Sequence, residues 1–509
     1  MPDDEKIERK PRRHVLRNTV FTLLSRAQGA VFTYLIIRLL LSVLSVEQYG
    51  LHALLFIGIM MNVSPLFQFG IPNIMSRFIP EFYRGSRFGL INIIFRTFVR
   101  AQSIVAIATA LMAIIFADQI AIWTNYPDYG TVIRIFAFSA ITFTVSQLYQ
   151  DLLEGVFQLR LSFWINLANN VIRLSSLYVV TRFYPTLTAV VLTEIGVKIV
   201  RLGVYAVIYY RMFPEVSHAK SHTVDKPPWK AMRRYGVLSY LNEVGVALLS
   251  VATDMLLVTG ISGALATGYF ALANRITSVI GQILPEQSLA PVTRPLFFSE
   301  YGSSSSRQAA GFGFAMMMKA SLFTSLLVGI WLVFMAEPVI VYWFDARFSE
   351  AGALLAVMAV FLAVNSVRFP LGLMLQNAHR VDLTIYAKAT VFIKIGLGLW
   401  LVPQFGAIAM VWIAGSTIFL QNVVLYYFIV SRLGHRGDPV GMAKIVLNGL
   451  ISAGIFYLIR PYFNSLIGVL MSPFVFFVIY VGINILHKSF KPEEREFINN
   501  HLPRRLWLF

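Results

Sequence analysis

The chain has 509 residues, of which 57% are hydrophobic and 13% are charged, and its formal net charge at pH 7 is +18. Soluble globular domains carry about 25% charged residues, so this composition excludes an ordinary soluble protein. The absence of Cys excludes disulfides, Cys-based metal sites and thiol chemistry. We therefore expect an all-α polytopic membrane protein, whose backbone polar groups are satisfied inside helices.

Residues 1–15 form a basic tail that we expect to be cytoplasmic. The apolar segment after it is long enough to span a bilayer, which argues against a cleavable signal. About 14 transmembrane helices are predicted along the chain. The first six form an N-lobe over residues 16–211, with helices at 16–41, 48–70, 88–117, 130–153, 158–181 and 186–211.

A linker at 212–235, predicted to be cytoplasmic, follows the N-lobe. A C-lobe over residues 236–431 comes next, with helices at 236–259, 263–288, 309–336, 351–375, 382–402 and 405–430. Two C-terminal helices lie within 440–487, at 440–460 and 464–487. Residues 488–509 mix charges with Phe and Trp, which predicts an amphipathic tail on the cytoplasmic surface.

An internal repeat with an offset of about 220 residues relates the two lobes. Tyr49-Gly50 in the first lobe is mirrored by Gly268-Tyr269 in the second, and Tyr209-Tyr210 corresponds to Tyr426-Tyr427. Six helices per lobe is an even number, so both lobes keep the same orientation. The repeat is therefore a parallel one, with its pseudo-two-fold axis along the membrane normal.

Lys and Arg are unevenly divided between the two predicted sides of the membrane. The tails and the 212–235 linker are rich in both, whereas the opposite loops hold only Arg182, Arg347 and Arg460. The positive-inside rule then predicts a multi-pass cell membrane protein with both termini in the cytoplasm. Because this rule also explains the net charge, nucleic acid is not an expected partner.

The predicted helices contain far more Lys and Arg than Asp and Glu. Each Arg or Lys at the centre of a lipid-facing helix costs roughly 2.5–3.5 kcal/mol. The cations are therefore expected to face a wet interior, which would suit an anionic passenger. Arg26 and Arg275 are the strongest candidates, because they lie at similar depths, about 15 Å from the inner face and about 18 Å from the outer face.

Further candidate substrate-binding cations lie on several other helices. Guanidinium groups bind phosphate bidentately and Lys supplies a point charge, so the set would suit a diphosphate or an acidic sugar. Each cation could instead pack against a neighbour or extend to the interface. The candidates are Arg96 and Arg100, which share a helix face, with Lys319, Arg368, Lys394 and, in addition, Lys388.

Acidic residues in the predicted helices are few. Glu243 and Asp254 are expected on nearly the same face of helix 236–259, where either could bind a coupling H⁺ or Na⁺. Ion pairing is the favoured alternative, since Glu243 has a depth close to that of Arg275. Glu194, Lys198 and Arg201 follow one another at helical spacing, and a local salt-bridge ladder explains them.

The sequence gives little support for catalysis. It contains no P-loop and no HExxH motif, and it has no long outer loop with paired acidic residues. His218 and His222 have a spacing that can bind a metal on a helix, but a surface loop is the favoured interpretation. We expect no enzyme activity, no metal and no cofactor.

Several segments resemble the polysaccharide transporter branch of the multidrug/oligosaccharidyl-lipid/polysaccharide exporter superfamily, whose members include O-antigen-type lipid-linked oligosaccharide flippases. The resemblance covers about residues 10–490 and depends on the order of its motifs as much as on any one of them. The motifs are TLLSR at 22–26 with Gly29, VEQYG at 46–50, FGIPNIMSRFIPEF at 69–82, and the stretch from Asp254 through GYFALANRI at 268–276.

This resemblance implies two lobes, alternating access and a polyprenyl-diphosphate-linked oligosaccharide as the substrate, moved from the inner to the outer leaflet. It also implies that Arg26 and Arg275 hold the diphosphate, and that helices 440–460 and 464–487 form a groove for the polyprenyl tail. Phe32 stands where lipid II flippases have another arginine, which favours a polysaccharide repeat unit over lipid II. Membrane lipids and polysaccharide assembly proteins are further expected partners.

A multidrug or small-molecule extruder of the same fold is the alternative function. That branch typically has twelve helices and an acidic cation-binding residue in its first lobe. The first predicted helix of this chain has neither Asp nor Glu, and a basic cavity is unsuited to cationic drugs.

Overall fold

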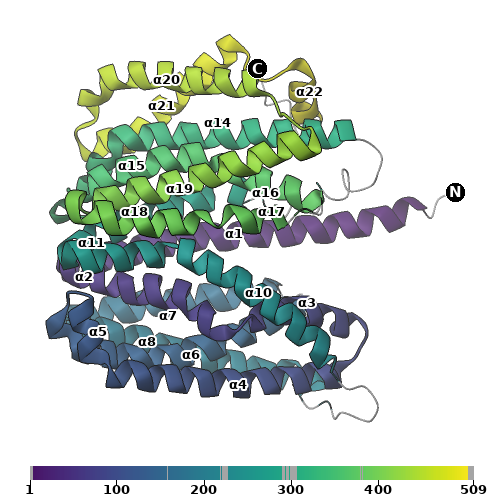
Figure 1. Ribbon diagram of the computed structural model, residues 1–509, viewed down its shortest axis with the longest axis vertical. Coiled ribbons are helices and arrows are strands. Elements are labelled where there is room, and N and C mark those ends of the chain that lie inside the picture. Colours follow the sequence, from purple (N-terminus) through teal and green to yellow (C-terminus); the bar gives the residue numbers. More distant parts are fainter. Residues whose placement is uncertain are drawn as a thin grey trace. The chain divides into compact units, whose positions relative to one another are not determined.

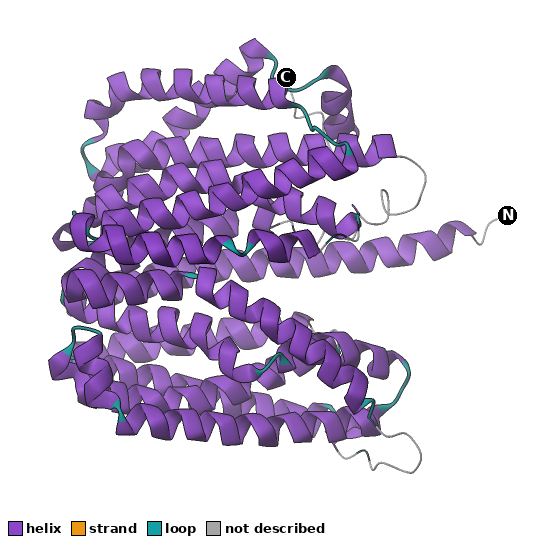
Figure 2. Cartoon of the chain, in the orientation of Figure 1, coloured by secondary structure: helices purple, strands orange, loops and turns teal. Residues whose placement is uncertain are grey.

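The computed structural model is helical throughout the part of the chain that it describes (Figures 1 and 2). The described residues are 4–156, 159–217, 219, 227–288, 290, 293, 297, 307–378, 380 and 382–501. By their internal contacts they divide into two compact units, Met1–Ala271 and Leu272–Phe509. Each unit is described by itself below.

Unit 1 contains long helices at the positions that the sequence predicted, together with several short ones. Its first elements are α1 (Asp4–Val43), α2 (Val46–Ala53), η1 (Leu54–Val63), η2 (Ser64–Gln68), α3 (Ile71–Arg84), α4 (Phe88–Ile115), α5 (Ala117–Trp123) and η3 (Pro127–Tyr129). They are followed by α6 (Gly130–Gly155), α7 (Leu159–Phe183), α8 (Leu187–Met212), α9 (Pro214–Ser217), α10 (Trp229–Leu249) and α11 (Val251–Ile283), the last of which runs on into unit 2.

Unit 2 begins at Leu272, within α11. Its first elements are α12 (Pro285–Ser288), α14 (Arg307–Val339), η4 (Ile340–Phe344), η5 (Ala346–Phe348), α15 (Ala351–Val364), η6 (Asn365–Val367) and α16 (Arg368–Asn377). They are followed by α17 (Asp382–Ala387), α18 (Thr390–Phe405), α19 (Ala407–Phe428), η7 (Ile429–Leu433), α20 (Pro439–Ile459), η8 (Arg460–Phe463), α21 (Leu466–His487) and α22 (Pro492–His501).

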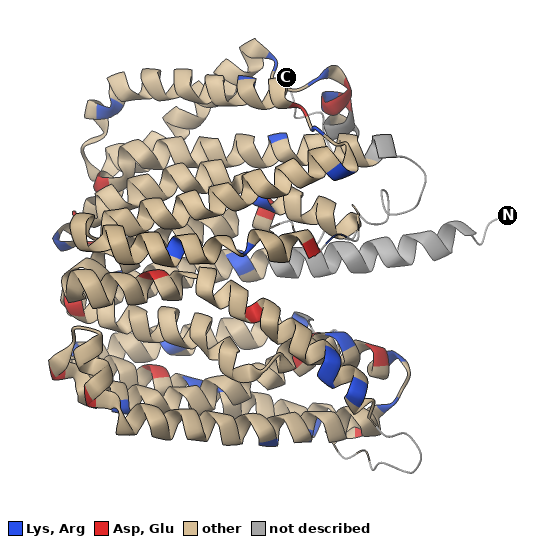
Figure 3. Cartoon of the chain, in the orientation of Figure 1, with Lys and Arg blue, Asp and Glu red and all other residues tan. Residues whose placement is uncertain are grey.

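Eleven helical stretches of the described chain are long and apolar enough to cross a membrane. Helices α7, α8 and α10 are also long and lie where spans were predicted, but they carry more charged side chains. Figure 3 shows how sparse Lys, Arg, Asp and Glu are along the middle of most long helices. The predicted all-α polytopic membrane fold is confirmed.

Several helices begin where the sequence offers a side-chain cap. Ser45 and Gln48 form a reciprocal capping box at the start of α2, and Thr186 caps α8. Asp438 caps α20, and Ser465 caps α21. Each cap satisfies amide groups that would otherwise lack partners at the end of a helix in an apolar environment.

Two predicted helix boundaries are wrong. The predicted helix at 236–259 is broken at Ser250, whose extended backbone separates α10 from α11. The segment after 48–70 contains a separate amphipathic helix, α3, which the sequence analysis missed. Phe69 and Gly70 both have left-handed backbone conformations, so they end the preceding helix and allow α3 to begin.

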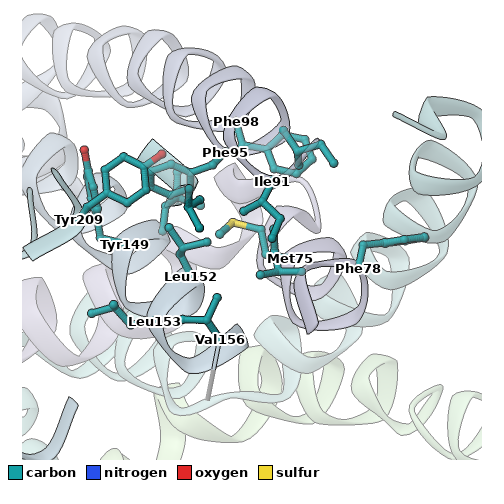
Figure 4. Packing of buried hydrophobic residues seen from close by; sticks show 14 of the residues in the cluster. Met75, Phe78, Ile91, Phe95, Phe98, Tyr149, Leu152, Leu153, Val156 and Tyr209 are labelled. Atoms are coloured by element: carbon teal, nitrogen blue, oxygen red, sulfur yellow. The ribbon is translucent and has the colours of Figure 1, made fainter. Parts of the chain in front are cut away.

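Each unit has its own hydrophobic core. In unit 1, aromatic and aliphatic side chains of α3, α4, α6 and α8 pack together, as in the cluster around Phe95, Tyr149 and Tyr209 (Figure 4). The apolar face of α3 joins this core through Met75 and Phe78, which explains why so short a helix is stable. In unit 2, a second core forms among α14, α16, α17 and α19.

The repeat-related glycines Gly50 and Gly268 contact each other within unit 1. A Cβ atom on Gly50 would lie 2.7 Å from the backbone nitrogen of Gly268, and one on Gly268 would collide with the Val46 carbonyl. The crossing of α2 and α11 is therefore backbone against backbone, and only glycine fits there. Nearby, Asn125 donates hydrogen bonds to the carbonyls of Thr259 and Gly260, at 2.8 and 3.1 Å.

We expect Gly268→Val to destabilise the protein by about 1–3 kcal/mol, because the added methyl groups force the two backbones apart. Thermal unfolding of the purified protein in detergent measures this effect. Gly203→Ala on α8 is the matched control, since nothing lies within 4 Å of its added Cβ. The control should leave the melting temperature unchanged or raise it slightly. Equal melting temperatures for Gly268→Val and the unmodified protein would contradict the tight crossing.

Candidate functional site

Arg26 and Arg275 lie in two different membrane spans. Arg26 is on α1 within the span Leu23–Val43, and Arg275 is on α11 within the span Val251–Ile283. Both side chains are half-buried. They belong to different units, so their common role in binding a substrate stays a prediction.

Arg368 lies at a break in the middle of a membrane span in unit 2. The span Ala351–Asn377 changes from α15 to the short 3-10 turn η6 and then to α16, which begins at Arg368. Asn365 braces this turn by donating a hydrogen bond to the Gly415 carbonyl at 3.1 Å and accepting one from Asn422 at 3.1 Å. The Arg368 side chain is exposed and has no hydrogen-bond or ion-pair partner among the described residues.

The two lysines near the start of α18 differ in exposure. Lys394 is buried, with 2% of its surface exposed, whereas Lys388 is half-buried in the turn between α17 and α18. Both interact with neighbouring groups. Contact of either lysine with a substrate stays a prediction.

Arg96 holds a backbone segment in unit 1. Its Nη2 donates a hydrogen bond to the Ser217 carbonyl at 2.9 Å. Asn92, one turn earlier on α4, donates to the carbonyls of Ser217 and Ala219 at 3.3 and 3.1 Å. Arg96 therefore has a packing role at the end of α9, which the sequence analysis named as the alternative. Arg100, one turn further along α4, is exposed.

Lys319 lies at the centre of a buried ion cluster in unit 2. Its side chain on α14 is 0% exposed, and its Nζ donates to Asp438 Oδ2 at 2.8 Å and also to Glu494 Oε2. The Phe490 ring lies 5.4 Å from the same nitrogen. Lys319 thus ties α14 to the start of α20 and to α22. A cation engaged in this way is not available to a substrate, so we leave Lys319 out of the proposed binding set.

The charge state of Asp438 depends on this cluster. Burial opposes ionisation, but hydrogen bonds from Lys319 and from the Gly441 amide outweigh it and hold the pKa of the Asp438 carboxyl below its usual value. A carboxyl whose pKa is lowered in the folded state stabilises the fold at pH values above its usual pKa. This stabilisation is lost as the pH falls through the folded-state value.

Glu243 and Asp254 do not share one continuous helix, because the break at Ser250 lies between them. Glu243 on α10 accepts a hydrogen bond from Asn73 Nδ2 of α3 at 3.2 Å. Asp254 on α11 is buried. The expected common helix face is therefore wrong, while ion coupling and the pairing of Glu243 with Arg275 stay predictions.

A buried ion cluster on α8 was assigned incorrectly from the sequence. Glu194, which is 1% exposed, is bonded by Arg173 of α7, with Nε 2.9 Å from both carboxylate oxygens and Nη2 2.5 Å from Oε1. His52 Nε2 of α2 lies 3.7 Å from Glu194 Oε1. The salt bridge thus joins different helices, and the expected ladder along α8 is wrong for Glu194. The sequence did offer one signal for this cluster, because its ionisable side chains lie on three different predicted spans.

Metal binding finds no support in the described residues, which contain no group of three or more His, Cys, Asp or Glu side chains that could hold an ion. His218 and His222 lie outside the described residues.

Comparison with known proteins gives the family. A family model described as polysaccharide biosynthesis protein matches residues 15–297, which is more than half of the chain. The chain belongs to this family. The teichuronic acid biosynthesis protein TuaB of Bacillus subtilis is 24% identical over 299 residues, a match that takes in 58% of this chain and 59% of that protein.

Solved structures share the fold. The lipid II flippase MurJ, in an inward closed conformation, matches with a TM-score of 0.70 and 15% identity over 93% of this chain and 99% of that chain. An inward-facing multidrug resistance transporter of the MATE family, within the MOP superfamily, matches with a TM-score of 0.67 and 13% identity over 83% of this chain and 99% of that chain. The fold is therefore that of the MOP transporters, as the sequence motifs indicated.

We expect Lys319→Met to destabilise the protein by about 3–5 kcal/mol, because it leaves two buried carboxylates without their cation. Thermal unfolding in detergent at neutral pH measures the loss. Lys444→Met, an exposed cation on α20, is the control and should be nearly neutral. If both variants melt at the temperature of the unmodified protein, the cluster does not stabilise the fold.

Proposed function

We propose that this protein is a flippase that moves a polyprenyl-diphosphate-linked oligosaccharide from the inner to the outer leaflet of the cytoplasmic membrane. Its family comprises polysaccharide biosynthesis proteins, and MurJ, which shares its fold, is a lipid II flippase. The substrate, the direction and the membrane are part of the proposal. Translocation by alternating access would require no enzyme activity.

The proposal depends mainly on the environment of Arg368. An exposed guanidinium without a protein partner in the described structure, inside a membrane span, needs water or an anion to offset its charge. A diphosphate matches the planar fork of Arg, which donates two parallel hydrogen bonds. Arg26 and Arg275, each half-buried in a span, are the proposed partners of Arg368 in holding the diphosphate.

A multidrug extruder is the second candidate, since MATE transporters share the fold. The membrane span Leu23–Val43 of α1 contains neither Asp nor Glu, so this part of the helix offers no carboxylate for a cationic drug. Comparing the binding of a labelled cationic dye with that of a diphosphate lipid separates the two functions. We expect the diphosphate lipid to bind more tightly.

Replacing Arg26 or Arg275 by Ala is expected to abolish glycan translocation, because either change removes a guanidinium that would bind the diphosphate. The measurement is the flipping of a fluorescent polyprenyl-diphosphate sugar in reconstituted vesicles. Arg→Lys at either position should restore only part of the activity, since the bidentate fork is lost.

The control for this experiment is Arg211→Ala, an exposed cation near the end of α8, together with the amount of each variant that inserts into the vesicles. Near-normal flipping by both Arg26→Ala and Arg275→Ala would remove the proposed diphosphate site.

The orientation in the membrane is a separate prediction. The distribution of Lys and Arg predicts that the segment before α10 and the region around α22 are cytoplasmic. Because the chain has no Cys, single Cys residues can be placed at the exposed positions Ala231, Glu493 and Asp128. Only Asp128→Cys should react with an impermeant maleimide on intact cells. Reaction of Ala231→Cys or Glu493→Cys before permeabilisation would contradict the orientation.

Glu243 and Asp254 are proposed either to form ion pairs or to bind a coupling ion, and the membrane potential is proposed to assist export of the anionic substrate. Polysaccharide assembly proteins are proposed as partners that receive the exported unit.

A further inference from the structure

Four helices of unit 1 bring a group of polar and charged side chains together inside the bundle. We call this group the α8 polar cluster. It extends along α8 from Glu194 to Arg201, a distance of about 10 Å at the helical rise per residue. Its members are His52 of α2, Gln150 of α6, Asn166 and Arg173 of α7, and Glu194, Lys198, Arg201 and Tyr205 of α8.

The charges of this cluster do not balance. Arg173 engages both oxygens of Glu194, so this carboxylate is already matched by one guanidinium. Lys198, one turn along α8 from Glu194, makes no ion pair within 4 Å in the described structure. Its Nζ instead lies 5.4 Å from the centre of the Phe56 ring. One positive charge of the cluster is therefore left over at Lys198.

Arg201 is a second cation that makes no direct ion pair in the described structure. Its Nη2 donates to three neutral groups: Gln150 Oε1 at 2.5 Å, Asn166 Oδ1 at 3.3 Å and the Tyr205 hydroxyl at 3.2 Å. Its buried Nε has no hydrogen-bond partner. These neutral acceptors hold the guanidinium in place. Gln150 in turn donates a hydrogen bond to Glu154 Oε1 at 2.8 Å, so Glu154 is linked to Arg201 through this amide and not by a direct ion pair. Placing two such cations on one face of a membrane helix is costly unless an anion offsets them.

The position of this pair relates it to the proposed diphosphate site. Arg201 lies eleven residues before the end of α8 at Met212, or about 16 Å along the helix. Arg26 is predicted at a similar depth on α1, and α1 packs against α7 within unit 1. Lys198 and Arg201 are both half-buried.

We propose that Lys198 and Arg201 form a second anion site, which binds a carboxylate-bearing sugar of the transported glycan. This inference rests on the proposed flippase function and adds the substrate class, an acidic sugar such as a hexuronate. Lys198 would supply a point charge, and the partnerless Nε of Arg201 a directional hydrogen bond. The name of the relative TuaB, a teichuronic acid biosynthesis protein, is consistent with an acidic glycan.

Two fluorescent probes test this site in reconstituted vesicles. Both are polyprenyl-diphosphate disaccharides, and they differ only in a terminal glucuronate or glucose. The Lys198→Gln/Arg201→Gln double variant should lose about tenfold or more of its flipping of the glucuronate probe, the loss expected when charge-assisted hydrogen bonds are removed. Its flipping of the glucose probe should stay within about twofold of the unmodified protein, which also shows that the variant is folded.

Two controls distinguish this site from the diphosphate site. Arg26→Gln should impair both probes, and Lys444→Gln, an exposed cation on α20, should impair neither. If the double variant flips each probe as fast as the unmodified protein does, the acidic-sugar site is overturned and the flippase function stands.

If neither probe is flipped by the unmodified protein, the proposed flippase function is removed. A binding measurement then still tests the anion site. Soluble digalacturonate is titrated into the detergent-purified protein, with neutral maltose as the control sugar. The unmodified protein should bind digalacturonate at least about tenfold more tightly than the double variant does, and maltose weakly in both cases. Equal affinities of the two proteins for digalacturonate would refute the anion site.

Discussion

The cost of an unmatched charge inside a membrane is the constraint on which the rest of this structure depends. A bilayer core offers no water to a charged side chain, so each one must meet a counter-charge, reach a wet cavity or bind a ligand. The two buried ion clusters show the first solution. Arg173 matches Glu194 in unit 1, and Lys319 meets Asp438 and Glu494 in unit 2.

Three cations outside these pairs are among those that we propose to bind substrate. Arg368, Lys198 and Arg201 have no carboxylate within 4 Å in the described structure. Arg368 lies in the span Ala351–Asn377, and Lys198 and Arg201 lie on α8, where the sequence predicted a span. All three are positively charged, and the family model that matches the chain is described as polysaccharide biosynthesis protein. An anionic glycan lipid would offset these charges only while it is bound. We propose that such cations favour an anionic substrate over neutral or cationic molecules, because only an anion recovers the cost of the exposed cations.

The sequence predicted the helices far better than their partners. Apolar length alone locates most spans, and capping residues such as Ser45 and Asp438 set where they begin. Pairing between distant residues is not encoded in local spacing. The sequence analysis therefore paired Glu194 with residues of its own helix, whereas its partner is Arg173 of α7. It likewise proposed Lys319 as a substrate-binding cation, whereas Lys319 forms an ion pair with Glu494, which lies far along the chain.

Breaks in the helices mark the places where an apolar pattern is a poor guide. The pattern continues through Ser250 and through η6, yet the backbone does not remain α-helical at either position. Non-helical backbone at membrane depth is tolerated where it is buried in protein or lines a cavity. At η6, amide side chains of Asn365 and Asn422 supply the support, and the exposed Arg368 follows directly. A helix break beside an unmatched cation gives an anion both a charge and nearby polar backbone, as in transporters whose substrate sites use discontinuous helices.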